Sequence, residues 1–434
     1  MTCEICPKVY IADQTQRVNI KISENIACGN TVSVKIQPME SYSIEHTPQY
    51  LLLEEERYPY IEAARADDGT FYLDYEFSGE QRYSVRVKLN CTDGAIYDGV
   101  NKDGTIGKQQ YVYSVEDDLS GLKPMKADTH LHSCRSDGVG TPFEVGIGYR
   151  KVGFDFIVIT DHHKMSPSLE AREQFSALTD KFFVIRGEEI HNRAIGYFHI
   201  VNIGGEISVN EIIETNGGFA ETEIEKYLEN DSYPKGTTPY VCAFRKFVSD
   251  MIRRGGGLAV MAHPYWNVCG EYNMATEDVK YLLRSNCYDA LELLAGCDRV
   301  GYGNNLQIAL WQELLCEGLQ IPVVGCSDSH NYADPKSLFN KQFTIVFAKD
   351  ESDVLSAIKE SRCVAVDKRE IYTIYGSFRL VKYSRFLMDE YYPEYEKLTS
   401  AHASALESGD KNIIAKAEAD IDDYVTRFFA FELK

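Results

Sequence analysis

The sequence predicts an α/β protein in which a small antiparallel β-sandwich precedes a parallel sheet or barrel, with a helical tail behind it. Three observations support this prediction. Residues from about 9 to 118 alternate apolar and polar side chains with the two-residue period of half-buried strands. From Met125 onward, apolar runs alternate with helical patterns, as in sheets whose strands are joined by helices. After Asp367 the pattern becomes helical and charged. We therefore expect three parts, at 1–122, 123–367 and 368–434.

The first part contains four runs with a clear period of two, at Val18–Ile22, Thr31–Ile36, Phe71–Phe77 and Tyr83–Leu89. Asp67-Asp68-Gly69 and Asp93-Gly94 supply the residues that tight turns favour. We interpret this part as a sandwich with a packing or oligomerisation role. Binding of a sugar or of a partner stays open, because a fold does not by itself imply a function.

The boundary to the second part is the polar segment 116–124, which contains Gly and Pro. The first helix behind it has a clear start, with Thr141 as N-cap, Pro142 at the first helical position and Glu144 completing a capping box. Further helices are expected near 167–179, 239–254, 276–285, 305–317 and 351–361. Seven strands are expected to end near 131, 160, 189, 202, 262, 294 and 326. Residues 206–235 interrupt this alternation, and we expect them to cap the mouth of the barrel.

Composition limits the classes of function. The formal net charge of −21 disfavours binding to long nucleic acid, since phosphate contacts need clustered Lys and Arg. No stretch approaches the roughly 20 apolar residues of a membrane span, and the first residues lack the apolar core of a signal peptide. The twelve cysteines show no regular spacing, which is typical of reduced thiols. We therefore expect a cytoplasmic protein without a membrane partner, and leave a homo-oligomer open.

Histidines gather at the ends of the apolar runs. Eight of the ten lie between positions 130 and 330. Four stretches carry most of them: Asp128-Thr129-His130-Leu131-His132, Thr160-Asp161-His162-His163, Ala262-His263-Pro264 and Ser327-Asp328-Ser329-His330. In a βα barrel the carboxyl ends of the strands meet at one face, so these side chains are expected to lie together. Imidazole and carboxylate ligands together suit Zn, Mn or Fe, and the sequence therefore predicts a transition-metal site.

These four stretches, in this order, resemble the motifs of the PHP (polymerase and histidinol phosphatase) family of metal-dependent phosphoesterases over residues 125–366. The resemblance implies a PHP-type distorted (β/α)7 barrel, which is a TIM-like barrel. It also implies a trinuclear site with two or three divalent transition metal ions. The implied metal ligands are His130, His132, Asp137, His162, Glu189, His199, His263, Asp328 and His330.

Neighbouring residues leave alternatives at two of these positions. Only one of His162 and His163 can point into the site, and the motif favours His162. The Gly-x-Glu spacing favours Glu189 over Glu188. Asp161 is better placed to orient an imidazole than to bind metal.

Two further ligand assignments compete with structural roles. Asp137 lies in a Ser-Asp-Gly turn, where Asp is common for turn reasons alone. His199 lies within an apolar run and could be a hydrogen-bonded strand histidine.

The expected substrate contacts are Arg135, Arg186, Arg193, His191 and His163. A guanidinium fork matches phosphate oxygens, although these arginines could equally pair with the acids of the site. Tyr265 and Trp266 could stack on a flat substrate group or simply pack.

We therefore expect a hydrolase that cleaves a phosphoester of a small phosphorylated molecule by attack of a metal-bridging hydroxide. The expected catalytic residues are Glu189, Asp328 and His263. Two alternatives remain open. One is amidohydrolase-type hydrolysis of a C–N bond at the same cluster. The other is a non-catalytic scaffold whose N-terminal β domain binds a sugar or a partner.

Overall fold

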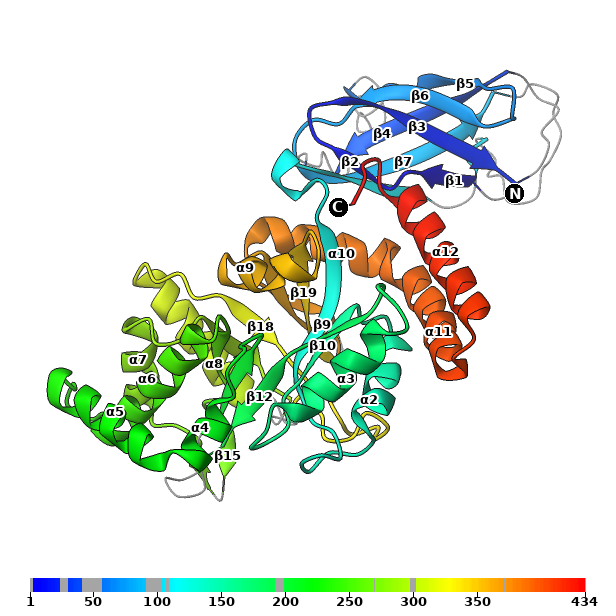
Figure 1. Cartoon of the computed structure of the whole chain (residues 1–434). Helices are drawn as coiled ribbons and strands as arrows, with labels where there is room; N and C mark the ends of the chain where they lie inside the picture. Colours follow the sequence, from blue (N-terminus) through cyan, green and yellow to red (C-terminus); the bar gives the residue numbers. More distant parts are fainter. Residues whose placement is uncertain are drawn as a thin grey trace. The chain divides into compact units, whose positions relative to one another are not determined.

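The computed structural model describes residues 3–23, 30–40, 57–90, 104–106, 109–191, 199–268, 270–296, 302–369 and 371–433. It shows a mixed α/β protein that divides into two compact units (Figure 1). The first unit comprises Met1–Leu122, Arg385–Pro393 and Asp420–Lys434, and the second comprises Lys123–Ser384 and Glu394–Ala419. Segments of the C-terminal helices thus belong to both units. The expected division into three parts stays a prediction.

The first unit is built on an eight-stranded sheet in the order β1-β3-β6-β5-β4-β7-β8-β2. Its neighbouring strands pair antiparallel except for β2 and β8, which are parallel. The strands are β1 (Cys3–Cys6), β2 (Val9–Ile11), β3 (Thr15–Ile22), β4 (Thr31–Pro38), β5 (Ile61–Arg65), β6 (Phe71–Glu76), β7 (Gln81–Leu89) and β8 (Gln110–Val115). Alternate side chains such as Val32, Val34 and Ile36 are buried in one apolar core, as the period of two predicts. The two-layer sandwich stays a prediction.

The second unit carries a six-stranded sheet in the order β11-β10-β9-β19-β20-β21 and a five-stranded sheet in the order β12-β13-β14-β17-β18. The strands of the first are β9 (Lys123–Leu131), β10 (Phe156–Ile159), β11 (Phe183–Ile185), β19 (Gln342–Ala348), β20 (Cys363–Asp367) and β21 (Thr373–Tyr375). Those of the second are β12 (Gly187–Ile190), β13 (Ile200–Ile203), β14 (Leu258–Met261), β17 (Ala290–Leu294) and β18 (Val323–Gly325). All seven expected strand ends lie within one residue of an observed end.

Strand direction departs from the expected parallel arrangement. β9, β10 and β11 are parallel, as are β14, β17 and β18. However, β13 is antiparallel to both of its neighbours, and β19 is antiparallel to β9 and β20. Only residues 191–199 separate β12 from β13, a connection too short for the crossover that a parallel pair needs. β19 was not expected from the sequence, although its apolar run from Phe343 to Ala348 is typical of a buried strand.

The two sheets of this unit meet at the ends of their strands. Isolated parallel bridges join Leu131 to Ser329 and His162 to Glu189. In addition, the Thr344 hydroxyl accepts a hydrogen bond of 3.0 Å from the Gly325 amide, which links β19 to β18. These links bring together the strand ends that carry the histidine motifs.

Helices connect and cover the strands of the second unit, and each of the expected helices is present. The capping box of α2 is confirmed: Thr141 accepts from the Glu144 amide, and Glu144 accepts from the Thr141 amide. The helices are α2 (Pro142–Arg150), α3 (Ser166–Ser176), α4 (Val209–Thr215), α5 (Gly217–Asn230), α6 (Pro239–Arg254), α7 (Thr276–Arg284), α8 (Tyr302–Cys316), α9 (Val354–Lys359), α10 (Phe378–Glu390), α11 (Tyr392–Ser408) and α12 (Lys411–Phe428). Within the described ranges, none of them is long and apolar enough to cross a membrane.

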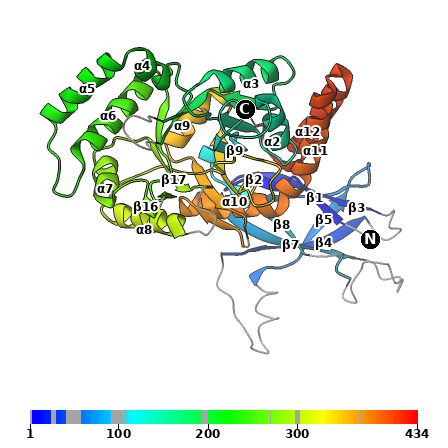
Figure 2. The same cartoon turned by 90° about the horizontal axis from the view of Figure 1, so that it is seen from below.

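The insertion at 206–235 contains the two helices α4 and α5. α5 lies beside α6 in both views of the molecule (Figure 1 and Figure 2). Its buried residues Ala220 and Ile224 join the apolar cluster that contains Phe244 and Phe247 of α6. The insertion is therefore anchored on α6, and its expected role as a cap over the barrel mouth stays a prediction.

Candidate metal centre

All nine ligands expected from the sequence lie in the described part of the chain, on segments that meet where the two sheets join. β9 and the residue after it carry His130 and His132, whereas Glu189 lies within β12. Every other ligand lies in a loop next to a strand: Asp137 after β9, His162 after β10, His199 before β13, His263 after β14, and Asp328 and His330 after β18.

Glu189 is the centre of the group. Its carboxylate is fully buried, and imidazole nitrogens approach both of its oxygens. Around Oε2 lie Nδ1 of His162 at 3.0 Å, Nε2 of His130 at 3.2 Å and Nε2 of His132 at 3.4 Å. Around Oε1 lie Nδ1 of His199 at 2.6 Å and Nε2 of His263 at 3.4 Å. Five imidazoles from four segments therefore converge on one carboxylate.

Asp328 provides a second carboxylate beside the same imidazoles. Its Oδ1 lies 3.1 Å from Nε2 of His132 and 3.4 Å from Nε2 of His130. The backbone of Asp328 has φ of +44°, and that of His263 has φ of +24°. Positive φ is strained for residues with a side chain, and such strain gathers at functional sites.

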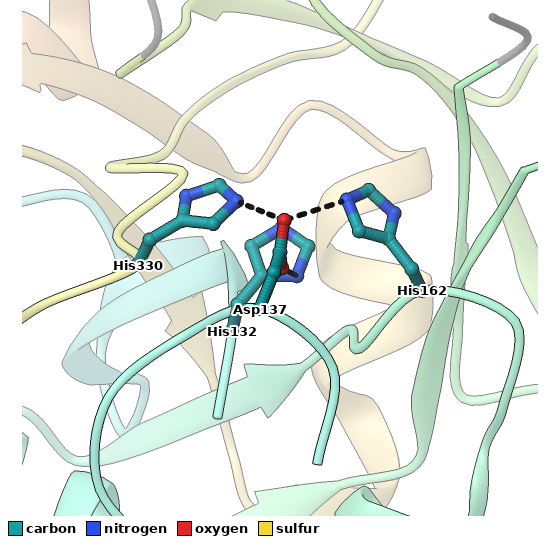
Figure 3. A group of neighbouring side chains, drawn as sticks. All are labelled: His132, Asp137, His162 and His330. Carbon is teal, nitrogen blue, oxygen red and sulfur yellow. Dashed lines mark ion pairs between the residues drawn. The ribbon is translucent and has the colours of Figure 1, made fainter. Parts of the chain in front are cut away.

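A more open group forms around Asp137. Its carboxylate lies 3.4 Å from Nε2 of His330, 3.6 Å from Nε2 of His162 and 3.7 Å from Nδ1 of His132. Figure 3 shows His330 and His162 approaching this carboxylate from opposite sides. The side chain of Asp137 is 53% exposed and that of His330 is 39% exposed, whereas those of His130 and Glu189 are at most 1% exposed. The cluster thus has a buried end and a solvent-facing end.

Asp161 holds the loop that presents Asp137. Its carboxylate accepts hydrogen bonds from the Ser133 amide and hydroxyl, at 3.0 and 2.6 Å, and from the amide and hydroxyl of Ser136. This corrects the expectation that Asp161 orients an imidazole. No pattern in the sequence indicates that the loop containing Ser133 and Ser136 folds back onto Asp161.

Gly138 is needed in the same loop. A Cβ at this position would lie 2.6 Å from the carbonyl oxygen of His132. Its amide also donates a hydrogen bond of 2.9 Å to the carbonyl of Ser133.

Glu188 points away from the cluster, which agrees with the choice of Glu189. The Glu188 carboxylate accepts hydrogen bonds of 2.7 Å from the Val209 amide and from the Ser208 hydroxyl at the start of α4. Asn202 and Asn210 also donate to it. Adjacent residues of a strand face opposite sides, so one glutamate anchors the insertion while the other joins the imidazoles.

Glu292 is a site residue that sequence reasoning missed. Its Oε1 lies 2.7 Å from Nδ1 of His130, and both side chains are fully buried. The signal for it was available, because Glu292 is the only charged residue in the apolar strand Ala290–Leu294. A lone carboxylate in a buried strand requires a partner.

Charge in the cluster shifts its pKa values strongly. Burial alone would raise the pKa of Glu189, but the imidazoles of His199, His130 and His162 hold it well below its ordinary value. Burial likewise opposes ionisation of Asp328, whose pKa is nevertheless lowered by His130 and His132. Both carboxylates are therefore ionised and able to attract cations.

The donor set fits divalent transition metal ions. Both oxygens of Glu189, Nε2 of His130 and Nδ1 of His162 are buried, and they make no hydrogen bond within the described ranges. Such atoms carry a large desolvation cost unless something else satisfies them. Donors bound to one ion at about 2.1 Å lie roughly 3.0 to 3.4 Å apart, which is the spacing of most of these atoms around Glu189.

The expected substrate contacts lie in different places. His163 and His191 lie at the cluster, with His191 5.1 Å from the ring of His162 and stacked on His163 at 4.9 Å. Arg135 lies in the Asp137 loop, but its Nε and Nη2 donate to both oxygens of Glu170, at 2.9 and 2.7 Å. Arg193 lies outside the described residues.

The expectation that Arg186 contacts substrate stays a prediction that the strand register does not favour. Arg186 pairs with Gly204, at the end of the β12–β13 hairpin away from Glu189 and His199. Three residues along a strand cover about 10 Å, so closeness in sequence to Glu189 does not place it at the site. Its guanidinium lies 3.2 Å from Glu206.

The two aromatic residues after His263 lie in different surroundings. Tyr265 is 4% exposed and belongs to the apolar core. Trp266 lies beside the cluster, with its ring 5.4 Å from that of His263 and 5.5 Å from that of His199. Tyr265 is therefore a packing residue of the core. For Trp266, a contact with substrate stays a prediction.

Comparisons with known proteins give partial similarities, and no family model matches the chain. An uncharacterized protein of Methanocaldococcus jannaschii is 25% identical over 195 residues, which is 42% of this chain and 90% of that protein. A Bacteroides vulgatus structure, a two-domain protein containing a predicted PHP-like metal-dependent phosphoesterase, is 22% identical with a TM-score of 0.39. The match covers 56% of this chain and 65% of that one. An amidohydrolase structure from Chromobacterium violaceum with bound sulfate is 17% identical with a TM-score of 0.33, over 47% of this chain and 87% of that one. Matches at these levels do not establish membership of a family.

Proposed function

We propose that this chain is a metal-dependent hydrolase that cleaves a phosphoester of a small phosphorylated molecule. The observation that carries the proposal is the Glu189 carboxylate, buried among five imidazoles and beside Asp328, with both of its oxygens unsatisfied by hydrogen bonds in the described ranges. The choice of a phosphoester follows the resemblance of the four histidine motifs to the PHP family. The proposal includes the distorted (β/α)7 barrel of that family.

The metal ligands in this proposal form three neighbouring sets. Glu189 and Asp328 with His130 and His132 form the first set. Glu189 with His199 and His263 forms the second, and Asp137 with His132, His162 and His330 forms the third. When bound there, two or three ions of Zn, Mn or Fe would supply an activated water and offset charge on the phosphoryl oxygens.

The proposed roles of the site residues differ between the buried end and the exposed end of the cluster. Glu189 and Asp328 supply ionised carboxylates at the buried end, where the side chains of Glu189 and His263 are shielded from bulk water. Asp137 and His330 are the exposed end, so we propose that the phosphoryl group enters beside them. The pKa of His330 is raised to about 9 by Asp137 and Asp328 against the effect of burial, so this imidazole must lose a proton before it can bind metal at neutral pH.

Substrate recognition is proposed for the rim of the cluster. His163 and His191 lie beside His162, and Trp266 lies beside His199 and His263. Arg135 would have to exchange its ion pair with Glu170 for a contact with the phosphoryl group. We propose a cytoplasmic location, which the free thiols of all eight described cysteines support.

The test is elemental analysis of protein purified without chelator, combined with hydrolysis assays. Glu189→Gln removes one charged oxygen from the centre of the group, and Glu188→Gln is the matched control, because that buried carboxylate faces α4. We expect two or three equivalents of transition metal in wild type and hydrolysis of p-nitrophenyl phosphate. Glu189→Gln should lose both metal and activity, while folded Glu188→Gln keeps them.

The outcomes separate the rival functions. Metal binding with hydrolysis of simple amides, and none of phosphate esters, would replace this proposal by hydrolysis of a C–N bond. Less than one equivalent of bound metal under metal-replete conditions would contradict the proposed catalytic centre. Attention would then move to the N-terminal sheet as a binding domain.

A further inference from the structure

Glu292 occupies a position where a carboxylate is costly. It lies in the middle of β17 between Leu291 and Leu293, and its side chain is fully buried. Removal of a carboxylate from water costs several kcal/mol unless charge and hydrogen bonds compensate. The strand needs only apolar residues for packing, so the contacts of this carboxylate must explain its presence.

Both oxygens of Glu292 have a specific partner. Oε1 lies 2.7 Å from Nδ1 of His130. Oε2 accepts a hydrogen bond of 2.9 Å from the backbone amide of His263. One side chain therefore connects two of the proposed metal ligands, which lie at the ends of β9 and β14.

The contact with His130 fixes which ring nitrogen faces the cluster. A carboxylate only accepts hydrogen bonds, so Nδ1 of His130 is the N–H donor. In the neutral imidazole that metal binding requires, Nε2 then carries the lone pair, and this atom lies 3.2 Å from Oε2 of Glu189 and 3.4 Å from Oδ1 of Asp328. Metal-binding histidines are commonly oriented by a carboxylate on their other nitrogen in this way.

The contact with His263 holds a strained backbone. His263 has φ of +24°, which surrounding contacts must stabilise. The Glu292 carboxylate accepts a hydrogen bond from the backbone amide of His263. The side chain of His263 faces the cluster, with its Nε2 3.4 Å from Oε1 of Glu189.

We propose that Glu292 is a positioning residue that sets the tautomer of His130 and the backbone turn at His263, and so prepares both imidazoles for metal. The inference rests on the proposed function in that it requires metal binding at Glu189. It adds a residue outside the nine expected ligands, which acts through two of them.

A direct ligand role for Glu292 is the competing interpretation, since its carboxylate lies near His130 and Cys326 in a group that could hold an ion. The contacts argue against it. Both carboxylate oxygens are engaged by N–H donors, and the Cys326 thiol donates to the carbonyl of Leu294 at 3.5 Å.

The experiment titrates metal-free protein with Mn²⁺ alone and measures the apparent dissociation constant and the Tm of each apoprotein. The variants are Glu292→Gln, Glu292→Asp and the control Glu188→Gln. An amide presents one oxygen and one NH₂ group, so it cannot accept from both His130 and His263. We expect Mn²⁺ affinity to fall about 10- to 100-fold in Glu292→Gln. Glu188→Gln should stay within about twofold of wild type, because its partners lie at α4.

Glu292→Asp covers the case in which Glu292→Gln does not fold. The shorter carboxylate keeps its charge but cannot reach both donors, so its affinity should fall less than in Glu292→Gln and still by severalfold. In a His130→Ala background, replacement of Glu292 should weaken Mn²⁺ binding far less than in wild type, because the imidazole through which it mainly acts is gone.

The failures of the two proposals are distinguishable. If wild-type apoprotein does not bind Mn²⁺, the proposed function fails. If wild type binds but the folded Glu292 variants bind equally well, the inference is overturned and the proposed function stands. A lowered apoprotein Tm with unchanged affinity would show a merely structural role and would also overturn it. A Glu292 variant that binds Mn²⁺ more tightly than wild type would also overturn the inference.

Discussion

The hydroxyl of Tyr149 on α2 donates a hydrogen bond of 3.0 Å to Oδ2 of Asp128 on β9, and both side chains are fully buried. The same hydroxyl lies 2.9 Å from the Ser327 hydroxyl, and Oδ1 of Asp128 accepts from the Ser327 amide at 3.1 Å. Burial raises the pKa of Asp128 to about 6. Asp128 and Tyr149 thus fix the backbone immediately before Asp328.

Tyr149→Phe should destabilise the fold and weaken the metal centre. The change leaves a buried carboxylate with one donor fewer, which costs about 1–3 kcal/mol of unfolding free energy. It also loosens the turn that presents Asp328, so Mn²⁺ affinity should fall. Urea unfolding and Mn²⁺ titration measure the two effects. Tyr227→Phe is the control, because its hydroxyl donates to Asp250 on α6. An equal effect of both variants on Mn²⁺ affinity would contradict the proposed link to Asp328.

Gly138→Ala should selectively affect the exposed end of the cluster. The added Cβ meets backbone atoms of His132 at 2.6 and 2.7 Å, so the loop must shift and carry Asp137 with it. We expect metal content to fall by about one equivalent while the buried ions remain. Elemental analysis beside Gly218→Ala checks this, because a Cβ at Gly218 meets nothing within 4 Å. Unchanged metal content in Gly138→Ala would show that Asp137 is not a ligand.

That the candidate ligands lie close together could be expected from the sequence, for a physical reason. Each of His130, His162, His263 and Asp328 follows or ends an apolar strand, and strand ends that share one face bring such residues together. The N-cap of α2 was predictable because it is a local feature, in which Thr141 and Glu144 each accept a hydrogen bond from the backbone amide of the other.

What the sequence could not show depends on contacts between distant segments. Glu292 acts on His130 across 162 positions, and no local pattern marks that pairing. Arg186 directly precedes β12, and closeness to Glu189 in the sequence does not show which end of that strand faces the cluster. Asp161 was assigned to an imidazole because the fold of the loop at Ser133 and Ser136 is a tertiary feature.

Removal of metal should lower the Tm of wild type and leave Glu189→Gln almost unaffected. Ions that bind only the native state stabilise it by about 2.7 kcal/mol when their free concentration is 100 times the dissociation constant. The unsatisfied oxygens of Glu189 make the metal-free centre the less stable form. Thermal melts with and without EDTA test this, followed by addition of excess Mn²⁺ to restore the Tm. A wild-type Tm indifferent to both additions would contradict metal binding by the cluster.

His402 should make stability depend on pH independently of the cluster. This residue of α11 is fully buried, and Nε of Arg150 donates to its Nδ1 at 3.1 Å. Its other nitrogen lies 3.4 Å from the Thr179 hydroxyl and 3.5 Å from Glu418. Burial, together with the charges of Arg150 and Lys181, lowers the pKa of His402 to about 3.

The sign of the effect follows from this lowered pKa. Between pH 6.5 and 3 the unfolded chain binds a proton at His402 that the folded chain does not, so stability is lost as pH falls through this window. From pH 7 to pH 5 the loss is about 2 kcal/mol, at about 1.4 kcal/mol per pH unit once the unfolded imidazole is protonated. His402→Gln keeps an acceptor for Arg150 but does not titrate. Urea unfolding at pH 7, 6 and 5 should therefore give wild type a steeper loss than His402→Gln by that amount. Parallel losses in the two proteins would mean that His402 is already protonated in the fold, and that the Arg150 contact does not keep it neutral.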